Sequence, residues 1–425
     1  MVTCDPKGGI ENLITTLKPF LSFIRNPLGL SHIKIQDMRF LWLSGLCNSV
    51  GMMGGQVVLG WVILEITESP LMLGIAMGIR FAPNFFLGIL AGTIADMFDR
   101  RRLMQLVNLI NALANGTIGI LIFLDIVEIW HILTLTFLSG SMMTLYMTAR
   151  SGFTYDISGP EKLVKGLAFT NIGMRMGGLI GSLVLGVILG KFGADIAYFV
   201  MVLSYVLSTL TLIHIRFVGR TGLTKKGTVW GNLRDLGIEV RRNSELRILA
   251  VLVAVVEVFG FTYMALLPVL AKDVLNIGAE GLGVLFAFMS GGGMLGIVVL
   301  SLFKDIRRKG LLWLLVLLGL ACALIGLGLS TNLYLAILFI ILVSSMTGLS
   351  DIFSQSLMQF AVPDEFRGRA MGVWNFAIGV MPAGNIQAGA LASMFGVTLA
   401  LVSHGTLLGI TAIVSLLVLP KLRKL

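Results

Sequence analysis

The chain has 425 residues, of which 56% are hydrophobic and only 13% are charged, and its net charge is +10. Soluble globular domains carry about 25% charged residues, so the composition excludes an ordinary soluble protein and indicates that lipid surrounds most side chains. A basic chain of this kind would suggest nucleic-acid binding if it were soluble. Here the lysines and arginines lie between long apolar segments, which favours a membrane explanation and no nucleic-acid partner.

Long apolar segments follow one another along the chain, and each has roughly the 20 residues that cross a bilayer. In lipid every backbone polar group must be satisfied within its own segment, so these segments are predicted to be helices. The N-terminal stretch lacks the apolar core of a cleavable signal peptide. We therefore predict an all-α membrane protein with twelve transmembrane helices, at about 40–66, 71–95, 103–124, 130–150, 166–190, 194–216, 248–271, 281–303, 311–329, 333–355, 369–394 and 396–419.

The basic residues are distributed unequally between the two sides of this arrangement. Of the 32 lysines and arginines, Lys191 and Lys272 lie on one side and Arg80 and Arg175 lie inside spans, whereas all the others lie on the opposite side. The positive-inside rule assigns the basic side to the cytoplasm. We expect a multi-pass protein of the inner (plasma) membrane with both termini cytoplasmic.

An internal repeat relates the two halves of the chain. The segment that begins at Ser158 superposes without gaps on the segment that begins at Ala361, so that Gly186 meets Gly389. Six spans in each half give both halves the same topology, which places a substrate site between them near the midplane. We predict five regions: a cytoplasmic arm 1–39, a first six-helix bundle 40–216, a cytoplasmic linker 217–247, a second six-helix bundle 248–419 and a cytoplasmic tail 420–425.

A short motif follows the second predicted span. It runs from Gly92 to Arg102 and resembles the G-x-x-x-D-R-x-G-R-R signature of the major facilitator superfamily, although Met97 replaces a basic residue and Asp99 replaces a glycine. Gly92 would let two helices approach, and Asp96 could bind a nearby basic residue or helix N-terminus. The alternative is a basic stop with a helix-capping aspartate. The resemblance implies a cytoplasmic gate formed by Gly92, Asp96, Asp99, Arg100, Arg101 and Arg102.

Other segments are similar to the enterobactin-exporter and macrolide-efflux branch of the same superfamily. This branch resemblance implies a secondary transporter that exports a small amphipathic molecule, siderophore-like or drug-like, by alternating access. A facilitator or importer on the same fold is the alternative. The expected partners are a small-molecule substrate, a proton or other ion gradient and the lipid bilayer, and the chain is expected to be a monomer. The similar segments are 40–43, 64–74, 80–83 and 362–369.

Several ionisable residues fall within the predicted spans, where each charge costs about 2.5–3.5 kcal/mol to insert. Glu257 lies near the middle of the seventh span, and desolvation should favour its neutral form, which makes it the candidate proton-coupling residue. The alternative is a structural partner for an intramembrane arginine. Arg80 could bind an anionic substrate or pair with Glu257, Arg175 is its analogue on the fifth span, and Asp351 is a candidate capping group on the tenth.

Uncharged polar residues recur along the first and fourth spans. Both spans would line the central cavity in the resembled fold, although hydrogen bonds between helices are an equal alternative. No Walker A phosphate loop is present, and the four histidines are scattered. We therefore expect no catalytic residues, metal or cofactor, an ion gradient as the energy source, and neither an enzyme nor a non-transporting receptor. The cavity-lining candidates are Ser44, Asn48, Gln56, Thr144, Thr148 and Ser151.

Overall fold

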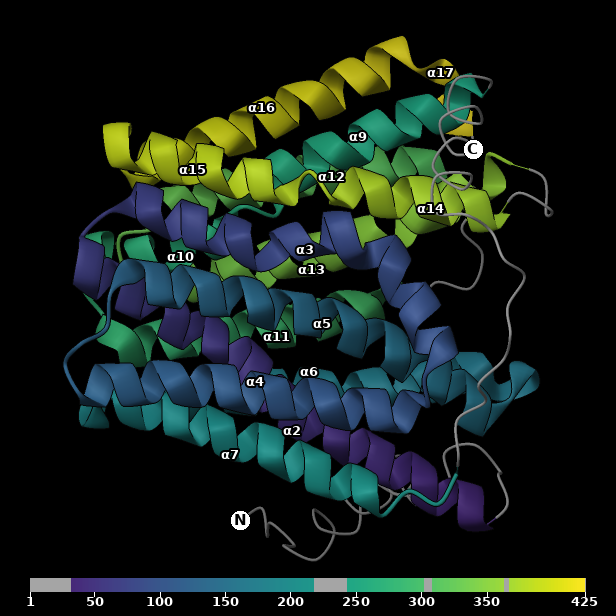
Figure 1. The fold of residues 1–425 in the computed structure, drawn as a ribbon. Helices are drawn as coiled ribbons and strands as arrows, with labels where there is room; N and C mark the ends of the chain where they lie inside the picture. Colours follow the sequence, from purple (N-terminus) through teal and green to yellow (C-terminus); the bar gives the residue numbers. More distant parts are fainter. Residues whose placement is uncertain (1–31, 218–242, 302–307, 363–366, 425) are drawn as a thin grey trace, which may run out of the picture.

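The computed structural model of the protein (Figure 1) describes residues 32–217, 243–301, 308–362 and 367–424. Its first half contains six long helices: α2 (His32–Thr67), α3 (Pro70–Met97), α4 (Arg100–Phe123), α5 (Ile129–Ser158), α6 (Leu163–Phe192) and α7 (Ala194–Ile213). The second half contains α9 (Ser244–Gly260), α10 (Tyr263–Val269), α11 (Gly278–Ser301), α12 (Lys309–Gly328), α13 (Leu333–Phe360), α14 (Arg367–Ile378), α15 (Met381–Phe395), α16 (Val397–Val418) and the short α17 (Pro420–Lys424).

Within the described residues, eleven helical segments are long and apolar enough to cross a membrane. One of them, Ser244–Val274, combines α9, α10 and a π-helical turn at Leu270–Val274. The twelfth crossing consists of α14 and α15, which are each too short to span alone. The prediction of an all-α membrane protein is confirmed, but the expected single helix over 369–394 is wrong.

Pro382 explains the break between α14 and α15. Proline has no backbone N–H, and its ring clashes with the carbonyl group four residues earlier, here that of Ile378. That residue is the last of α14, and Pro382 is the second residue of α15, a position in the first helical turn that tolerates proline. The chain therefore turns at Gly379 and Val380 and resumes as a new helix.

The predicted region boundaries differ from the helix ends by several residues. Helix α2 begins at His32, inside the predicted arm 1–39, and α9 begins at Ser244, inside the predicted linker 217–247. The rest of the arm and most of the linker lie outside the described residues. The predicted tail 420–425 contains α17.

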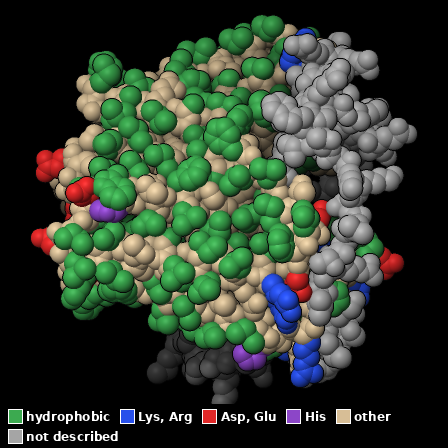
Figure 2. All heavy atoms as spheres, in the orientation of Figure 1, with side chains coloured by type: hydrophobic (Ala, Val, Ile, Leu, Met, Phe, Trp, Pro, Cys, Tyr) green, Lys and Arg blue, Asp and Glu red, His purple; other side chains and the backbone are tan. Residues whose placement is uncertain are grey.

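The helices pack as two groups, α2–α7 and α9–α16, which lie one above the other in Figure 1. We call the end of the molecule where α7 ends and α9 begins the linker end, and the opposite end the distal end. Figure 2 shows hydrophobic side chains over the middle of one face and charged side chains towards its two ends. This is the distribution expected of a protein that crosses a bilayer.

Two seams join the groups, one between α6 and α11 and one between α3 and α15. In each seam glycines bring backbones together near the distal end. A Cβ atom on Gly186 of α6 would lie 2.7 Å from the Cα of Gly283 in α11, and a Cβ atom on Gly389 of α15 would lie 2.9 Å from the Cα of Gly74 in α3. Only glycine permits such close helix contacts. The two glycines that the internal repeat aligns, Gly186 and Gly389, therefore occupy equivalent places in the two seams.

Candidate functional site

Three of the predicted intramembrane charges meet between the two helix groups. Glu257 of α9 is 4% exposed, and it interacts electrostatically with Asp351 of α13, which in turn interacts with Arg175 of α6. The Arg175 guanidinium extends across the α6–α11 seam. Its Nη1 would lie 3.0 Å from a Cβ atom placed on Gly293 of α11. One cation from the first half thus interacts with a carboxyl group of the second half, which in turn interacts with another.

Hydroxyl groups of the second half surround this charged group. The Tyr263 hydroxyl lies near the side chains of Ser344 and Thr347, although it forms no hydrogen bond of standard geometry with either. Ser344 donates a hydrogen bond to the Met289 carbonyl of α11, and Thr347 donates one of 3.0 Å to the Ser344 carbonyl. The charged group therefore lies in a polar site within an otherwise apolar helix interior.

Arg80 does not belong to this site. Its Nη2 donates a 2.9 Å hydrogen bond to the Met52 carbonyl of α2, and it interacts electrostatically with Tyr198 and Tyr205 of α7. Arg80 is 8% exposed and lies inside the first half. Among the described residues Glu257 forms no ion pair within 4 Å with any basic side chain, so the predicted pairing of Arg80 with Glu257 is absent.

A further arginine, Arg150, is buried inside the first half. The predicted fourth span ends at residue 150, which places Arg150 beside the loop that follows this span. In the structure α5 continues to Ser158, so Arg150 lies two turns inside the helix and is 5% exposed. Its Nη2 donates a 2.9 Å hydrogen bond to Oδ1 of Asn171 on α6. Within the described part of the chain its Nε and Nη1 have no hydrogen-bond partner.

Two of the cavity-lining candidates form a buried network between helices instead. Ser44 bonds to the Ser208 hydroxyl over 2.9 Å, and Asn48 donates a 2.8 Å hydrogen bond to Asn108, which donates one of 2.8 Å to Ser208. This network joins α2, α4 and α7 within the first half. For Ser44 and Asn48 the structure favours hydrogen bonding between helices over lining of the central cavity.

The other four candidates differ in their surroundings. Gln56 is buried, and Thr144 donates a hydrogen bond to Oδ1 of Asn84 on α3. Thr148 is half-buried and bonds back to the Thr144 carbonyl, whereas Ser151 is exposed. Thr148 and Ser151 are therefore the members of the predicted set that have free surface.

The motif that begins in the last turns of α3 forms an ion cluster at the linker end. Arg100 binds Asp96 through Nη2 and Asp156 of α5 through Nη1, both over 2.7 Å. Asp99 caps the N-terminus of α4 by accepting hydrogen bonds from the backbone N–H groups of Arg101 and Arg102. Asp156, which is almost fully buried, was not identified from the sequence because it lies 56 residues from its partner.

The remaining motif residues have separate roles. Arg101 donates a hydrogen bond to the Ile215 carbonyl, and the Arg102 side chain is exposed. A Cβ atom on Gly92 would have no described atom within 4 Å, so the close helix approach predicted at Gly92 is absent in this conformation. Gly296 of α11, which lies 204 residues further along the chain, does contact another helix, because a Cβ there would lie 2.6 Å from the Ser345 carbonyl oxygen.

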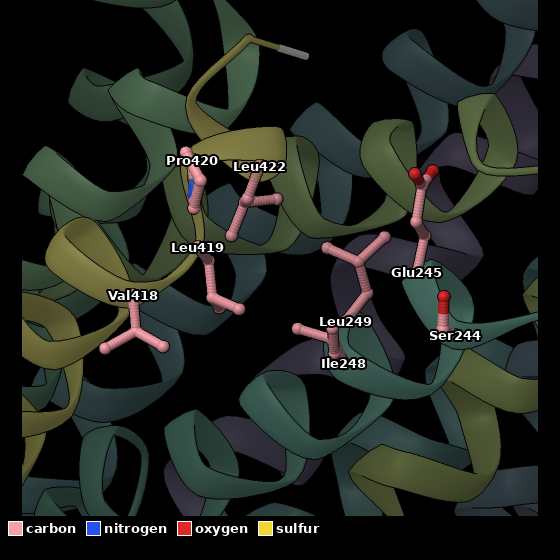
Figure 3. Close-up of a pocket in the computed structure, with 8 residues that line it drawn as sticks. All are labelled: Ser244, Glu245, Ile248, Leu249, Val418, Leu419, Pro420 and Leu422. Atoms are coloured by element: carbon pink, nitrogen blue, oxygen red, sulfur yellow. The ribbon is translucent and has the colours of Figure 1, made fainter.

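An apolar cleft of about 300 Å³ lies elsewhere, at the linker end of the second half. Figure 3 shows residues from the start of α9 on one side and residues from α16 and α17 on the other. No predicted site residue lines it, and Glu257 lies more than two helical turns further along α9. Its lining residues are Ser244, Glu245, Ile248, Leu249, Val418, Leu419, Pro420 and Leu422.

Comparison with known proteins identifies the family. The model of the family described as "Transmembrane secretion effector" matches residues 28–425. Because the match covers almost the whole chain, this protein belongs to that family of major facilitator superfamily transporters, whose members are not enzymes.

The chain is also similar to individual proteins, although distantly. It is 22% identical to the staphyloferrin A transporter of Staphylococcus aureus and to macrolide efflux protein A of Streptococcus pyogenes, in each case over 84% of this chain and 90% of the relative. Among solved structures, a nucleoside transporter matches with a TM-score of 0.75 at 12% identity, over 89% of this chain and 99% of that chain. A bacterial homologue of the lysosomal transporter Spinster, in an inward-facing conformation, matches with a TM-score of 0.69 at 14% identity, over 93% and 97%. These structural matches show a shared fold.

Proposed function

We propose that this member of the transmembrane secretion effector family exports a small amphipathic molecule, siderophore-like or drug-like, in exchange for protons. The relatives named above include a siderophore transporter and a macrolide efflux protein, and these names support the substrate class. The observation that carries the proposal is the group formed by Glu257, Asp351 and Arg175 between the two halves.

The proposal of proton coupling rests on the charge of this group. Two ionised carboxylates and one guanidinium leave one unpaired negative charge among membrane-spanning helices. An unpaired buried charge is unfavourable, and a carboxyl group in such a site relieves it by binding a proton. Glu257 is the better candidate for the proton-binding residue, because Asp351 already interacts with Arg175.

The conformation of the protein fits one state of an alternating-access cycle. The halves touch closely at the distal end, where the seam glycines meet and Lys272 Nζ donates a 3.0 Å hydrogen bond to the Leu64 carbonyl across the groups. Towards the linker end, a Cβ on Gly88 or Gly92 of α3 would meet no described atom within 4 Å. With both termini in the cytoplasm, as the positive-inside rule requires, this arrangement corresponds to an inward-facing state.

In this scheme the ion cluster at the linker end belongs to the cytoplasmic gate. Arg100 joins α3 and α4 to α5 through Asp96 and Asp156, so the linker ends of these three helices would move as one body. The capped start of α4 at Asp99 fixes the orientation of that body. The gating role proposed for Asp96 and Arg100 is to stabilise the moving surface as the second half approaches it.

Reconstituted transport tests the proposal. Purified protein is first screened in proteoliposomes against siderophores, antibiotics and organic anions, and efflux of the best substrate is then followed with and without a pH gradient. We expect the gradient to accelerate efflux by the wild type but not by Glu257→Gln. Glu245→Gln is the matched control, since Glu245 lies on the same helix beside the separate cleft. Equal, gradient-independent rates for wild type and Glu257→Gln would refute coupling, and counterflow without any gradient would favour a facilitator.

A further inference from the structure

Intramembrane charges of opposite sign are divided between the two halves. In the described part of the chain, the intramembrane arginines Arg80, Arg150 and Arg175 all belong to α3, α5 and α6 of the first half. The intramembrane carboxyl groups Glu257 and Asp351 belong to α9 and α13 of the second half. Arg80 donates a hydrogen bond to a backbone carbonyl and interacts with two tyrosines inside the first half. Arg150 and Arg175 are therefore the arginines left as candidates for binding a ligand.

Arg150 has unused hydrogen-bonding capacity. A guanidinium carries five N–H donors, and two of its nitrogens, Nε and Nη1, lack partners among the described residues although the side chain is 5% exposed. Leaving a buried donor unsatisfied costs about 1–3 kcal/mol, and more for a charged group. Arg150 interacts electrostatically with Tyr146, whose hydroxyl forms no hydrogen bond of standard geometry within the described residues. Two donor nitrogens of Arg150 are therefore buried without an acceptor in the described part of the chain.

Asn171 and Arg175 lie between Arg150 and the second half. Asn171 accepts the hydrogen bond from Arg150 and lies one helical turn before Arg175, so the two side chains share a face of α6. Both are exposed. The contact of Arg175 with Gly293 and its interaction with Asp351 show that this face of α6 is directed towards the second half and not towards lipid.

We propose that Arg175, Asn171 and Arg150 form a binding site for a carboxylate group of the transported molecule. Guanidinium groups match the geometry of carboxylates and bind them through paired, charge-assisted hydrogen bonds. A carboxylate at this site competes with Asp351 for Arg175. The proposal rests on the proposed transport function and adds to it the chemical class of the substrate.

Chemical protection of arginine tests this site without a gradient. Purified protein is treated with phenylglyoxal, and modification of each arginine is measured by peptide mass spectrometry in the presence of citrate, 1-naphthoate, the neutral 1-naphthamide or sulfate. We expect Arg175 to be modified and a carboxylate to slow its modification about tenfold, which corresponds to 1.4 kcal/mol of protection. The exposed Arg102 at the linker end is the internal control and should react at the same rate throughout.

Each outcome bears on the proposal. Protection by citrate or naphthoate but not by naphthamide supports it, and Asn171→Leu should then weaken that protection. Protection by sulfate alone would identify a site for free inorganic anions and overturn the assignment to substrate. The absence of protection by every anion, or equal protection by naphthamide, would also overturn it. Because no proton gradient is present, a failure here is distinct from a failure of coupling through Glu257.

Discussion

Replacing Gly283 by alanine should open the distal end of the molecule. Gly283 lies on α11 in the α6–α11 seam, where an added Cβ atom would be 2.5 Å from the Ser182 carbonyl oxygen and 2.9 Å from the Cα of Gly186. Ordinary contact begins at 3.4 Å, so the Cβ is about 0.9 Å too close to a backbone oxygen. Backbone atoms of a packed helix cannot rotate away as a side chain can, and the two helices must separate.

The size of the effect follows from this displacement. Inserting one methyl group into a well-packed contact costs about 1–3 kcal/mol. In the proposed cycle this cost falls only on the state that is closed at the distal end, because the seam would be separated in the other state. The equilibrium between the two states should therefore shift about 5- to 150-fold towards the state open at the distal end.

Distance measurements between spin labels can detect this shift. Lys191 and Asn276 are exposed at the distal ends of the two halves, and cysteines at these positions in a cysteine-free background would report their separation. Gly291→Ala is the matched control, because Gly291 lies on the same helix and an added Cβ would meet nothing within 4 Å. If Gly283→Ala and Gly291→Ala give the same distance distribution, the seam does not hold the distal end closed and the reasoning fails.

Two further predictions concern stability within the first half. Arg100→Gln would leave the buried Asp156 carboxylate without its ion pair and should lower the free energy of unfolding by up to about 3 kcal/mol. Arg102→Gln, at an exposed side chain, should have little effect. Equal melting temperatures of these two variants in detergent would contradict this prediction. Asn108→Ala would leave the buried amide of Asn48 without its acceptor and would remove a donor to Ser208, at a cost of about 1–3 kcal/mol. Thr117→Ala on the same helix removes only an exposed bond to its own backbone, and a comparable loss of stability in both would disprove the role of the network.

The fold was predictable because lipid imposes a simple rule on the sequence. A segment without internal hydrogen bonds cannot cross the bilayer, so apolar runs of sufficient length had to be helices. The same rule does not show where a helix is broken, because neighbouring helices can satisfy the backbone polar groups that a break leaves unpaired. Pro382 lies inside an apolar run, and the sequence does not show whether a proline at this position ends the helix or only bends it. The structure shows that α14 ends at Ile378 and that α15 begins at Met381.

The candidate site was only partly predictable. Glu257, Asp351 and Arg175 could be identified because any charge within an apolar run is conspicuous, but their grouping depends on the packing of both α6 and α13 against α11, which the sequence does not show. Arg150 was missed because hydropathy ended its helix two turns too early. Asp156 and Asn108 were missed because their partners are distant in sequence, and no local pattern indicates such a contact.

The two halves share a scaffold but not its chemistry. The repeat places Gly186 and Gly389 in equivalent seams, where glycines bring the helix backbones similarly close. At the same shift of 203 residues, however, Arg175 corresponds to Ile378 and Leu179 to Pro382; only the second half has a broken helix here, and only the first has the cation. In the proposed cycle an anion therefore binds to one half and a proton to the other, and Arg175, which extends across the seam between them, is the residue for which the anion and Asp351 compete.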